Sequence, residues 1–230
     1  MTESNSSYQE PGALRVALRT AAILLIFMLV FTALMAGTYR ITAPMLEASA
    51  QAERLRVINE ILPAANYDND VLRDQVLVPP DAALNNASVS VVYRARQKDK
   101  PVAIVVEATA LDGYSGQIGL LLAISAEGRI LAQRVIRHKE TPGLGDYIDP
   151  KKDRNKQRPW INQFNQVGFD EVPFKQWRVK KDGGRFDQMA GATISARAVT
   201  NASARALLWV NQNRETLFSL PVGSRLEQVK

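Results

Sequence analysis

The stretch PVAIVVEATALDGYSGQIGLLLAISAEGRILAQRVIR, residues 101–137, decides the fold of this chain of 230 residues. Its apolar runs are short, the first is rich in β-branched residues, and Ala126-Glu127-Gly128 between the last two is a turn sequence. Consecutive strands joined by short turns favour an antiparallel sheet. Together with a weakly alternating run before the stretch, the predicted strands occupy residues 88–95, 102–108, 118–125 and 129–137.

Helical patterns flank this predicted sheet. From Ile194 the apolar residues continue at helical spacing, without Gly or Pro, until Pro221. A shorter amphipathic helix is predicted at 47–62, because Pro44 is expected to break the pattern before it. Residues 139–193, between the sheet and the last helix, are rich in loop-forming residues. The predicted fold class is therefore α+β, an antiparallel sheet covered by helices.

Residues 20–39 form a separate apolar segment. It contains no charged residue, and its length at a rise of ~1.5 Å per residue spans ~30 Å, the thickness of a bilayer's hydrocarbon core. The alternative is a cleaved signal peptide. The run is longer than the usual apolar region of about 7–15 residues, and Leu34-Met35-Ala36 is a poor cleavage site. We therefore interpret the segment as a retained transmembrane helix.

The charges around this segment predict its orientation. Arg15 and Arg19 precede it, whereas Arg40 alone follows closely, before Glu47. Short flanking segments rich in positive charge stay in the cytoplasm. We therefore expect the N-terminal tail to be cytoplasmic and the chain from residue 40 onwards to lie on the other side of the membrane.

The composition excludes several kinds of site. The chain has no cysteine, which excludes zinc–thiolate sites, iron–sulfur clusters and c-type haem, and its single histidine, His138, excludes a histidine-rich metal site. The net charge is +6, but the densest basic stretch, 151–158, is broken by Asp153. We interpret that stretch as a solvated loop, or as a segment attracted to an anionic membrane surface, rather than as a nucleic-acid site.

The segment Asp187-Gln188-Met189-Ala190-Gly191-Ala192-Thr193 directly precedes the last predicted helix. Thr193 is expected at or beside the N-cap, where unpaired backbone N–H groups and the positive end of the helix dipole favour a phosphate. Gly191 allows the backbone to approach a ligand closely, and Ala192 adds no bulk. The alternative is that the Thr193 hydroxyl simply caps the helix.

Two further loops carry glycine-rich sequences. Glu140-Thr141-Pro142-Gly143-Leu144-Gly145 follows a predicted strand and can lay its backbone against a flat ring. Gly113-Tyr114-Ser115-Gly116, between two predicted strands, can place an aromatic side chain near a ligand. Each of the two is also consistent with an ordinary turn.

The order of these features resembles that of one protein family. The transmembrane segment, Gly-Tyr-Ser-Gly, Glu-Thr-Pro-Gly-Leu-Gly and Asp-x-x-x-Gly-Ala-Thr follow one another over nearly the whole chain. This arrangement resembles the FMN-binding G subunit of the Rnf electron-transport complex. It also resembles the C subunit of the sodium-pumping NADH:quinone oxidoreductase. Chain length and the Ala190 variant of the last motif favour the former.

The resemblance implies a cofactor and its attachment. FMN would be linked through its phosphate to Thr193 by a flavin transferase that uses FAD and Mg²⁺, and Asp187 would be the acidic residue that the transferase recognises. Ala190 stands where the family often has Ser or Thr, so no hydroxyl is expected to act there. The residues expected to bind FMN are Thr193, Gly191, Ala192, Glu140, Thr141, Gly143, Leu144, Gly145, Tyr114 and Ser115.

The same resemblance implies a function. The chain would be an electron-carrier subunit of a bacterial inner-membrane complex that couples electron transfer to ion translocation, and not a freestanding enzyme with catalytic side chains or a metal. Its partners would be subunits of the A, B, C, D and E types, the flavin transferase and the membrane. The alternatives are the sodium-pump C subunit and a cofactor-free, membrane-anchored scaffold subunit.

The expected regions are a cytoplasmic tail (1–19), the transmembrane helix (20–39), a membrane-proximal helix and linker (40–87), a periplasmic FMN-binding domain (88–220) and a C-terminal tail (221–230).

Overall fold

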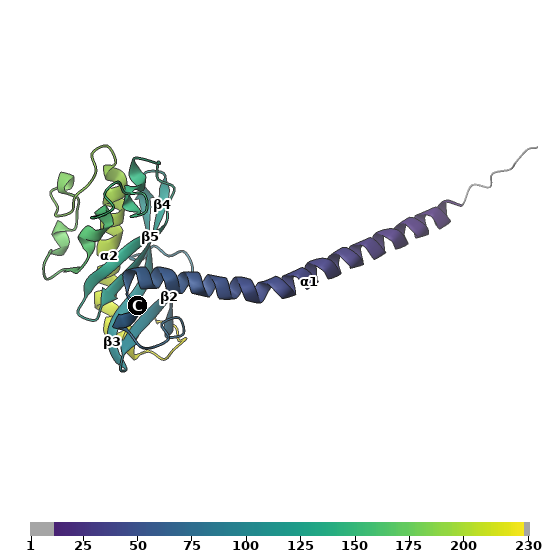
Figure 1. Ribbon diagram of the computed structural model, residues 1–230, viewed down its shortest axis with the longest axis horizontal. Coiled ribbons are helices and arrows are strands. Elements are labelled where there is room, and N and C mark those ends of the chain that lie inside the picture. Colours follow the sequence, from purple (N-terminus) through teal and green to yellow (C-terminus); the bar gives the residue numbers. More distant parts are fainter. Residues whose placement is uncertain (1–11, 228–230) are drawn as a thin grey trace, which may run out of the picture. The chain divides into compact units, whose positions relative to one another are not determined.

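The computed structural model describes residues 12–227, which divide into two compact units, one up to Glu53 and one from Arg54 onwards (Figure 1). The first unit is the N-terminal part of helix α1 (Ala13–Ile61). It includes the apolar segment 20–39 and is long and apolar enough to cross a membrane. The described residues do not bury its apolar side chains, so packing within the protein does not account for their hydrophobicity.

The prediction that Pro44 breaks the helical pattern is wrong. α1 is continuous through Pro44, and the helix predicted at 47–62 is its C-terminal part, which ends at Ile61. A proline removes one intrahelical hydrogen bond, here the one to the carbonyl of Arg40. Arg40 is exposed, so no protein group is left buried and unpaired by that loss. The Ala, Met, Leu and Glu residues that follow are good helix formers and carry the helix onward.

The second unit is built on one antiparallel sheet, as predicted. Its strands follow one another in chain order, so each pairs with its sequence neighbour. The pairing of β3 with β4 shifts register between Ala110 and Gly113, at the turn that carries Tyr114. The strands are β1 (Gln75–Val78), β2 (Ser90–Gln97), β3 (Lys100–Gly113), β4 (Gly116–Ser125), β5 (Arg129–Arg137) and β6 (Val167–Gly168).

Helices cover both faces of this sheet. Helix α2 (Thr193–Ser219) lies along one face, and its small side chains pack against buried residues of β3 and β4 such as Ile104 and Leu120 (Figure 1). The C-terminal part of α1 packs on the other face through Ile58 and Ile61. The predicted α+β class, an antiparallel sheet covered by helices, is therefore confirmed.

Two arginines of β2 hold the C-terminal end of α2. Arg94 Nη1 donates to the carbonyls of Leu217 (2.8 Å) and Leu220 (2.5 Å). Arg96 Nη2 donates to the carbonyl of Phe218 (2.7 Å). Cations at this end pair carbonyls that the helix leaves unsatisfied and interact favourably with its dipole. These bonds fix the C-terminal end of α2 relative to β2.

The described part of the C-terminal tail covers the free edge of β1. The N–H of Gly223 donates to the carbonyl of Gln75 (2.7 Å), and the N–H of Leu226 donates to the carbonyl of Leu77 (2.8 Å). Leu226 is buried in the main core. An edge strand that is paired in this way is closed to further strands.

Residues 138–192 connect β5 to α2 and form the loop-rich region that the sequence predicted (Figure 1). An aromatic cluster of Trp160, Phe164, Trp177 and Phe186 orders this connection, with neighbouring ring centroids 4.5 to 6.2 Å apart. Such ring pairs add to the stability that burial provides. The short 3₁₀ helices are η1 (Ala64–Asn66), before the sheet, and η2 (Gly145–Ile148), η3 (Trp160–Phe164), η4 (Phe174–Gln176) and η5 (Lys180–Asp182) within the connection.

Candidate functional site

The N-terminus of α2 is open to a ligand. Thr193 is the first helical residue, the N-cap is Ala192, and no side-chain hydrogen bond caps the first turn. The alternative that the Thr193 hydroxyl caps the helix is therefore wrong. The first turn has no acidic residue of its own, and its N–H groups and the positive end of the dipole favour an anion there; the Glu140 carboxyl group already contacts this turn through Ser195. Gly191 has φ +85°, which favours glycine, and a side chain there would meet only open space.

A buried tyrosine fixes the segment before this helix. The Tyr147 hydroxyl accepts a hydrogen bond from the N–H of Met189 (3.1 Å) and donates one to the carbonyl of Ala192 (3.3 Å). Burial raises the pKa of Tyr147, so the hydroxyl remains protonated and can donate. The turn between Met189 and Ala192 is closed by a further bond from the Ala192 N–H to the Met189 carbonyl (3.1 Å). The geometry around Thr193 is therefore preformed.

Glu140 joins the three motifs found in the sequence. Its carboxyl group is buried, with 4% of the residue exposed. The N–H of Ser115 donates to Oε1 (3.0 Å), and the Ser195 hydroxyl on the first turn of α2 donates to Oε2 in a short hydrogen bond. A Cβ added at Gly113 would lie 2.9 Å from Oε1, and one at Gly145 would lie 2.7 Å from Oε2. Close packing therefore requires both glycines, Gly113 also because a Cβ there would lie 2.2 Å from the Gly116 carbonyl and Gly145 also because one there would lie 2.6 Å from Ser195 Oγ.

A cavity of about 230 Å³ opens where the three segments meet. Its rim carries Tyr114, Leu144 and Ile194, which are 67%, 51% and 43% exposed. Large apolar side chains facing solvent around a concave site are typical of a binding surface. The cavity is lined by Tyr114, Glu140, Thr141, Leu144, Gly145, Gly191, Ala192, Ile194 and Ser195.

Most of the sequence-predicted residues come together here. Ser115 lies behind the cavity, with its N–H on Glu140. Gly143, at φ +75°, donates its N–H to Asp146 Oδ1 (2.9 Å) beside the lining residues. Thr193 is half-buried and does not itself line the cavity, although its chain neighbours Ala192 and Ile194 do. Seven predicted residues line the cavity directly: Tyr114, Glu140, Thr141, Leu144, Gly145, Gly191 and Ala192.

Three residues of the site escaped the sequence analysis. Ile194 and Ser195 line the cavity, and Tyr147 fixes the segment before α2. Ile194 could have been noticed as a large apolar residue in the first turn of a helix, next to the proposed ligand. Nothing local to Ser195 or Tyr147 indicates their partners, which lie 55 and 42 residues away in the sequence.

Asp187 lies outside this cavity. Its exposed carboxylate pairs with Lys180 Nζ (2.6 Å). Trp160 Nε1 donates a hydrogen bond to the backbone carbonyl of Asp187 (2.6 Å), and the backbone N–H of Asp187 donates one to Gln163 Oε1 (2.7 Å). It lines a second, larger cavity of about 600 Å³ together with residues 155 and 157–160. Any role of Asp187 is therefore separate from contact with a ligand in the first cavity.

The site lacks a group arranged for acid–base catalysis among the residues that the structure describes. Both oxygens of Glu140 accept hydrogen bonds within the protein, and His138 Nδ1 accepts the N–H of Glu140 (3.2 Å). Within residues 12–227 no group of His, Cys, Asp and Glu could hold a metal ion. What the arrangement offers is an anion site at a helix terminus beside an apolar rim. Such a site suits a ligand with a phosphate and a flat, largely apolar body.

Comparisons with known proteins agree with this arrangement. Residues 113–208 match the model of an FMN-binding domain, and residues 13–61 match the model of the RnfG N-terminal region. Proteins named as the G subunits of ion-translocating oxidoreductase complexes are similar over most of their length. Those of Pseudoalteromonas atlantica and Pseudomonas aeruginosa are each 40% identical to this chain over 205 residues. The matched residues make up 89% of this chain, 93% of the Pseudoalteromonas atlantica protein and 94% of the Pseudomonas aeruginosa protein. The protein of Vibrio cholerae is 39% identical over 88% of this chain and 94% of its own length.

Proposed function

Since the chain belongs to the family of G subunits of ion-translocating oxidoreductase complexes, we propose that it carries one FMN linked covalently, through its phosphate, to Thr193. The chain is an FMN-binding electron-carrier subunit of such a complex. The observation that supports the attachment is the convergence of three distant motifs on one cavity, beside a threonine whose hydroxyl caps nothing.

The described residues divide the task of holding this cofactor. The N–H groups of the first turn of α2 would hold the phosphate at Thr193, and Gly191 lets the backbone approach it. Tyr114, Leu144 and Ile194 would contact the ring system. Bound FMN supplies the redox chemistry, and the protein supplies position and surroundings. A cavity below the usual ~300–1,000 Å³ encloses only part of such a ligand, which leaves an edge accessible to redox partners.

The covalent link is tested on protein purified from native membranes. We expect the band on a denaturing gel to fluoresce under blue light, and the peptide that contains Thr193 to carry the mass of a flavin mononucleotidyl group. An unmodified peptide from cells that contain a flavin transferase would contradict the proposal. A dark band would show that no flavin is covalently attached; flavin released from the native protein would then mean non-covalent FMN, and only its absence would support the cofactor-free scaffold subunit. A flavin modification found on another residue would support covalent FMN but contradict its attachment to Thr193.

Maturation requires a second protein, which we propose to be a flavin transferase that recognises Asp187. The support is positional. Asp187 is exposed, lies outside the cofactor cavity and precedes Thr193 on the same segment. The remaining partners are the other subunits of the complex, proposed to be of the A, B, C, D and E types. Because the relatives are G subunits, the sodium-pump C subunit is no longer an alternative.

α1 anchors the protein to the membrane, and we propose that the N-terminus is cytoplasmic and the domain from Arg54 onwards periplasmic in a bacterial inner membrane. Arg15 and Arg19 before the apolar segment, against Arg40 after it, support this orientation. Protease added to intact spheroplasts should digest the domain while a cytoplasmic marker protein survives. A domain that is cut only after lysis would show the opposite orientation.

A further inference from the structure

The loop of residues 151–158, called the basic loop below, carries positive charge that no other part of the described chain neutralises. Its five cations are exposed, and none forms an ion pair within residues 12–227. Its one acidic residue, Asp153, is buried, so the exposed surface of the loop carries cations and neutral amides but no acid. The cations are Lys151, Lys152, Arg154, Lys156 and Arg158.

Internal hydrogen bonds fix the shape of this loop. The Asp153 carboxylate accepts the N–H groups of Asn155 (2.9 Å) and Trp160 (2.5 Å). Lys156 Nζ donates to the carbonyl of Lys151 (2.6 Å), across the loop. In a flexible linker, water would satisfy these backbone N–H groups, and a buried carboxylate that accepts them would not be needed. The backbone of the loop is therefore held in a fixed shape that presents exposed cations, as in a preorganised binding surface.

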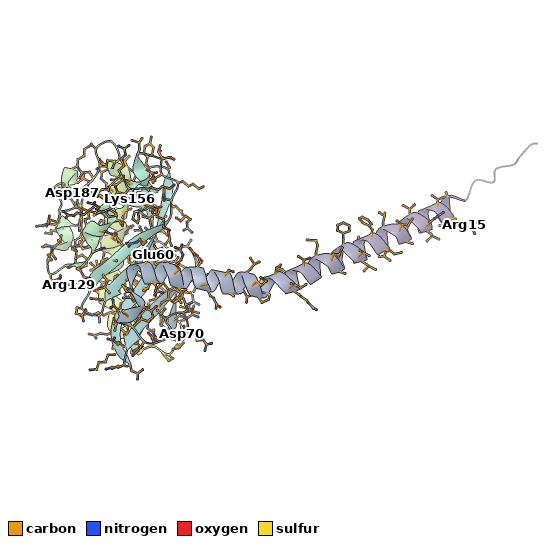
Figure 2. All side chains as sticks on the ribbon, in the orientation of Figure 1. Arg15, Glu60, Asp70, Arg129, Lys156 and Asp187 are labelled. Atoms are coloured by element: carbon orange, nitrogen blue, oxygen red, sulfur yellow. The ribbon has the colours of Figure 1, made fainter. Side chains whose placement is uncertain are left out.

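The basic loop adjoins the cofactor site. Arg154 Nη2 lies 3.5 Å from the carbonyl of Gly143, in the second motif. Trp160, which follows the loop, packs edge-on against Tyr147 (centroids 5.4 Å apart), and Tyr147 holds the turn before Thr193. Figure 2 labels Lys156 and Asp187 at the same end of the domain, and residues flanking Lys156 line one cavity with Asp187.

We propose that the basic loop is a docking surface for an acidic, redox-active protein that exchanges electrons with the cofactor; this proposal rests on the proposed function. A fixed cationic surface next to a redox site raises the rate at which an acidic partner meets that site, because opposite charges steer diffusional encounter. A polar, charged rim is also the usual periphery of a protein interface.

The loop is a poorer match for a membrane surface. Amphipathic segments that insert into a bilayer combine cations with apolar side chains that enter the acyl boundary. Polybasic segments bind an anionic bilayer by charge alone, so capture of lipid is an outcome that the crosslinking experiment must distinguish. The sequence Lys151-Lys152-Asp153-Arg154-Asn155-Lys156-Gln157-Arg158 contains no apolar residue. The second cavity, beside the loop, is lined mainly by amides and aromatic rings, which suit a folded partner, and its exposed acid, Asp187, is paired with Lys180.

Two variants separate local charge from net charge. The loop variant changes Lys151, Lys152, Lys156 and Arg158 to Gln and leaves Arg154, which touches the second motif. The matched control changes four exposed cations on other segments, Lys98, Lys100, Lys175 and Arg225, to Gln. Both lower the net charge by four. The reduced full-length protein is then oxidised in a stopped-flow instrument by ferricyanide, an anion, or by hexaammineruthenium(III), a cation.

We expect the ratio of the anionic to the cationic oxidation rate to fall about tenfold in the loop variant at low ionic strength and to change little in the control. High salt should remove the difference between wild type and the loop variant. An equal ratio in all three proteins would overturn the proposal. A preparation without flavin gives no oxidation signal at all, so failure of the proposed function is recognised separately.

The class of partner is tested in native membranes. A photo-crosslinking amino acid at position 152 or 156 should capture a redox subunit of the same complex at an acidic segment, mapped by mass spectrometry, and high salt should suppress the product. The same probe at position 98 should not capture it. Capture of lipid alone, or of no partner at low salt, would overturn docking to a protein.

Discussion

Replacing Thr193 by valine is expected to abolish covalent flavin, the largest effect that any single substitution in this chain should have. Valine has nearly the shape of threonine but no hydroxyl to form the phosphoester. Because Thr193 caps nothing, its loss should leave the helix start intact, and the thermal midpoint of unfolding should change little. In-gel fluorescence and the mass of the peptide measure the effect.

Two controls make this result specific to the hydroxyl. Thr193→Ser keeps a hydroxyl at the same helix position and should retain at least part of the flavin. Thr141→Val removes a second threonine that lines the same cavity and should leave the band fluorescent. If Thr193→Val still fluoresces after denaturation, the flavin is attached elsewhere. If Thr141→Val is also dark, fluorescence reports the integrity of the cavity rather than the attachment.

The parts of this fold that depend on local pattern were predictable from the sequence. The β-branched and apolar runs at 102–108 and 118–125 lie within β3 and β4, and the long run from Ile194 lies in α2. Alternation and helical spacing reveal these elements because the spacing of apolar residues within one segment shows which of its side chains face the core. The break expected at Pro44 was wrong, since one missing hydrogen bond does not outweigh the good helix formers that follow it.

The site was predictable only in part, for a different reason. Motif order indicated that residues near 114, 140 and 191 serve one ligand, and these residues do line one cavity. The sequence suggested that Glu140 contacts the ligand. The structure shows in addition that both its oxygens bind other parts of the chain, Ser115 and Ser195. Pairings between segments so far apart leave no periodic signal, because they depend on how the sheet and α2 bring loops together.

Glu140→Ala is expected to lower the free energy of unfolding by about 3–5 kcal/mol, because it leaves one buried and one part-buried donor unpaired and creates a void, each lost hydrogen bond costing about 1–3 kcal/mol. The donors are the N–H of Ser115 and the hydroxyl of Ser195. Glu140→Gln keeps the volume; its amide oxygen can accept the Ser115 N–H and its NH2 can donate to Ser195 Oγ, so it should lose only about 1 kcal/mol or less. Chemical denaturation of the full-length protein in detergent measures both.

A double-mutant cycle shows whether Glu140 acts by joining the segments. Ser195→Ala alone should cost about 1–2 kcal/mol, but in the Glu140→Ala background it should cost almost nothing, because its partner is already gone. Flavin content should follow the same pattern, since without Glu140 the first turn of α2 is no longer tied to the 113–116 turn. Additive losses would mean that the two residues stabilise the domain independently. The carboxyl group would then be a buried acceptor near the cavity, and the three motifs would be positioned by the surrounding core.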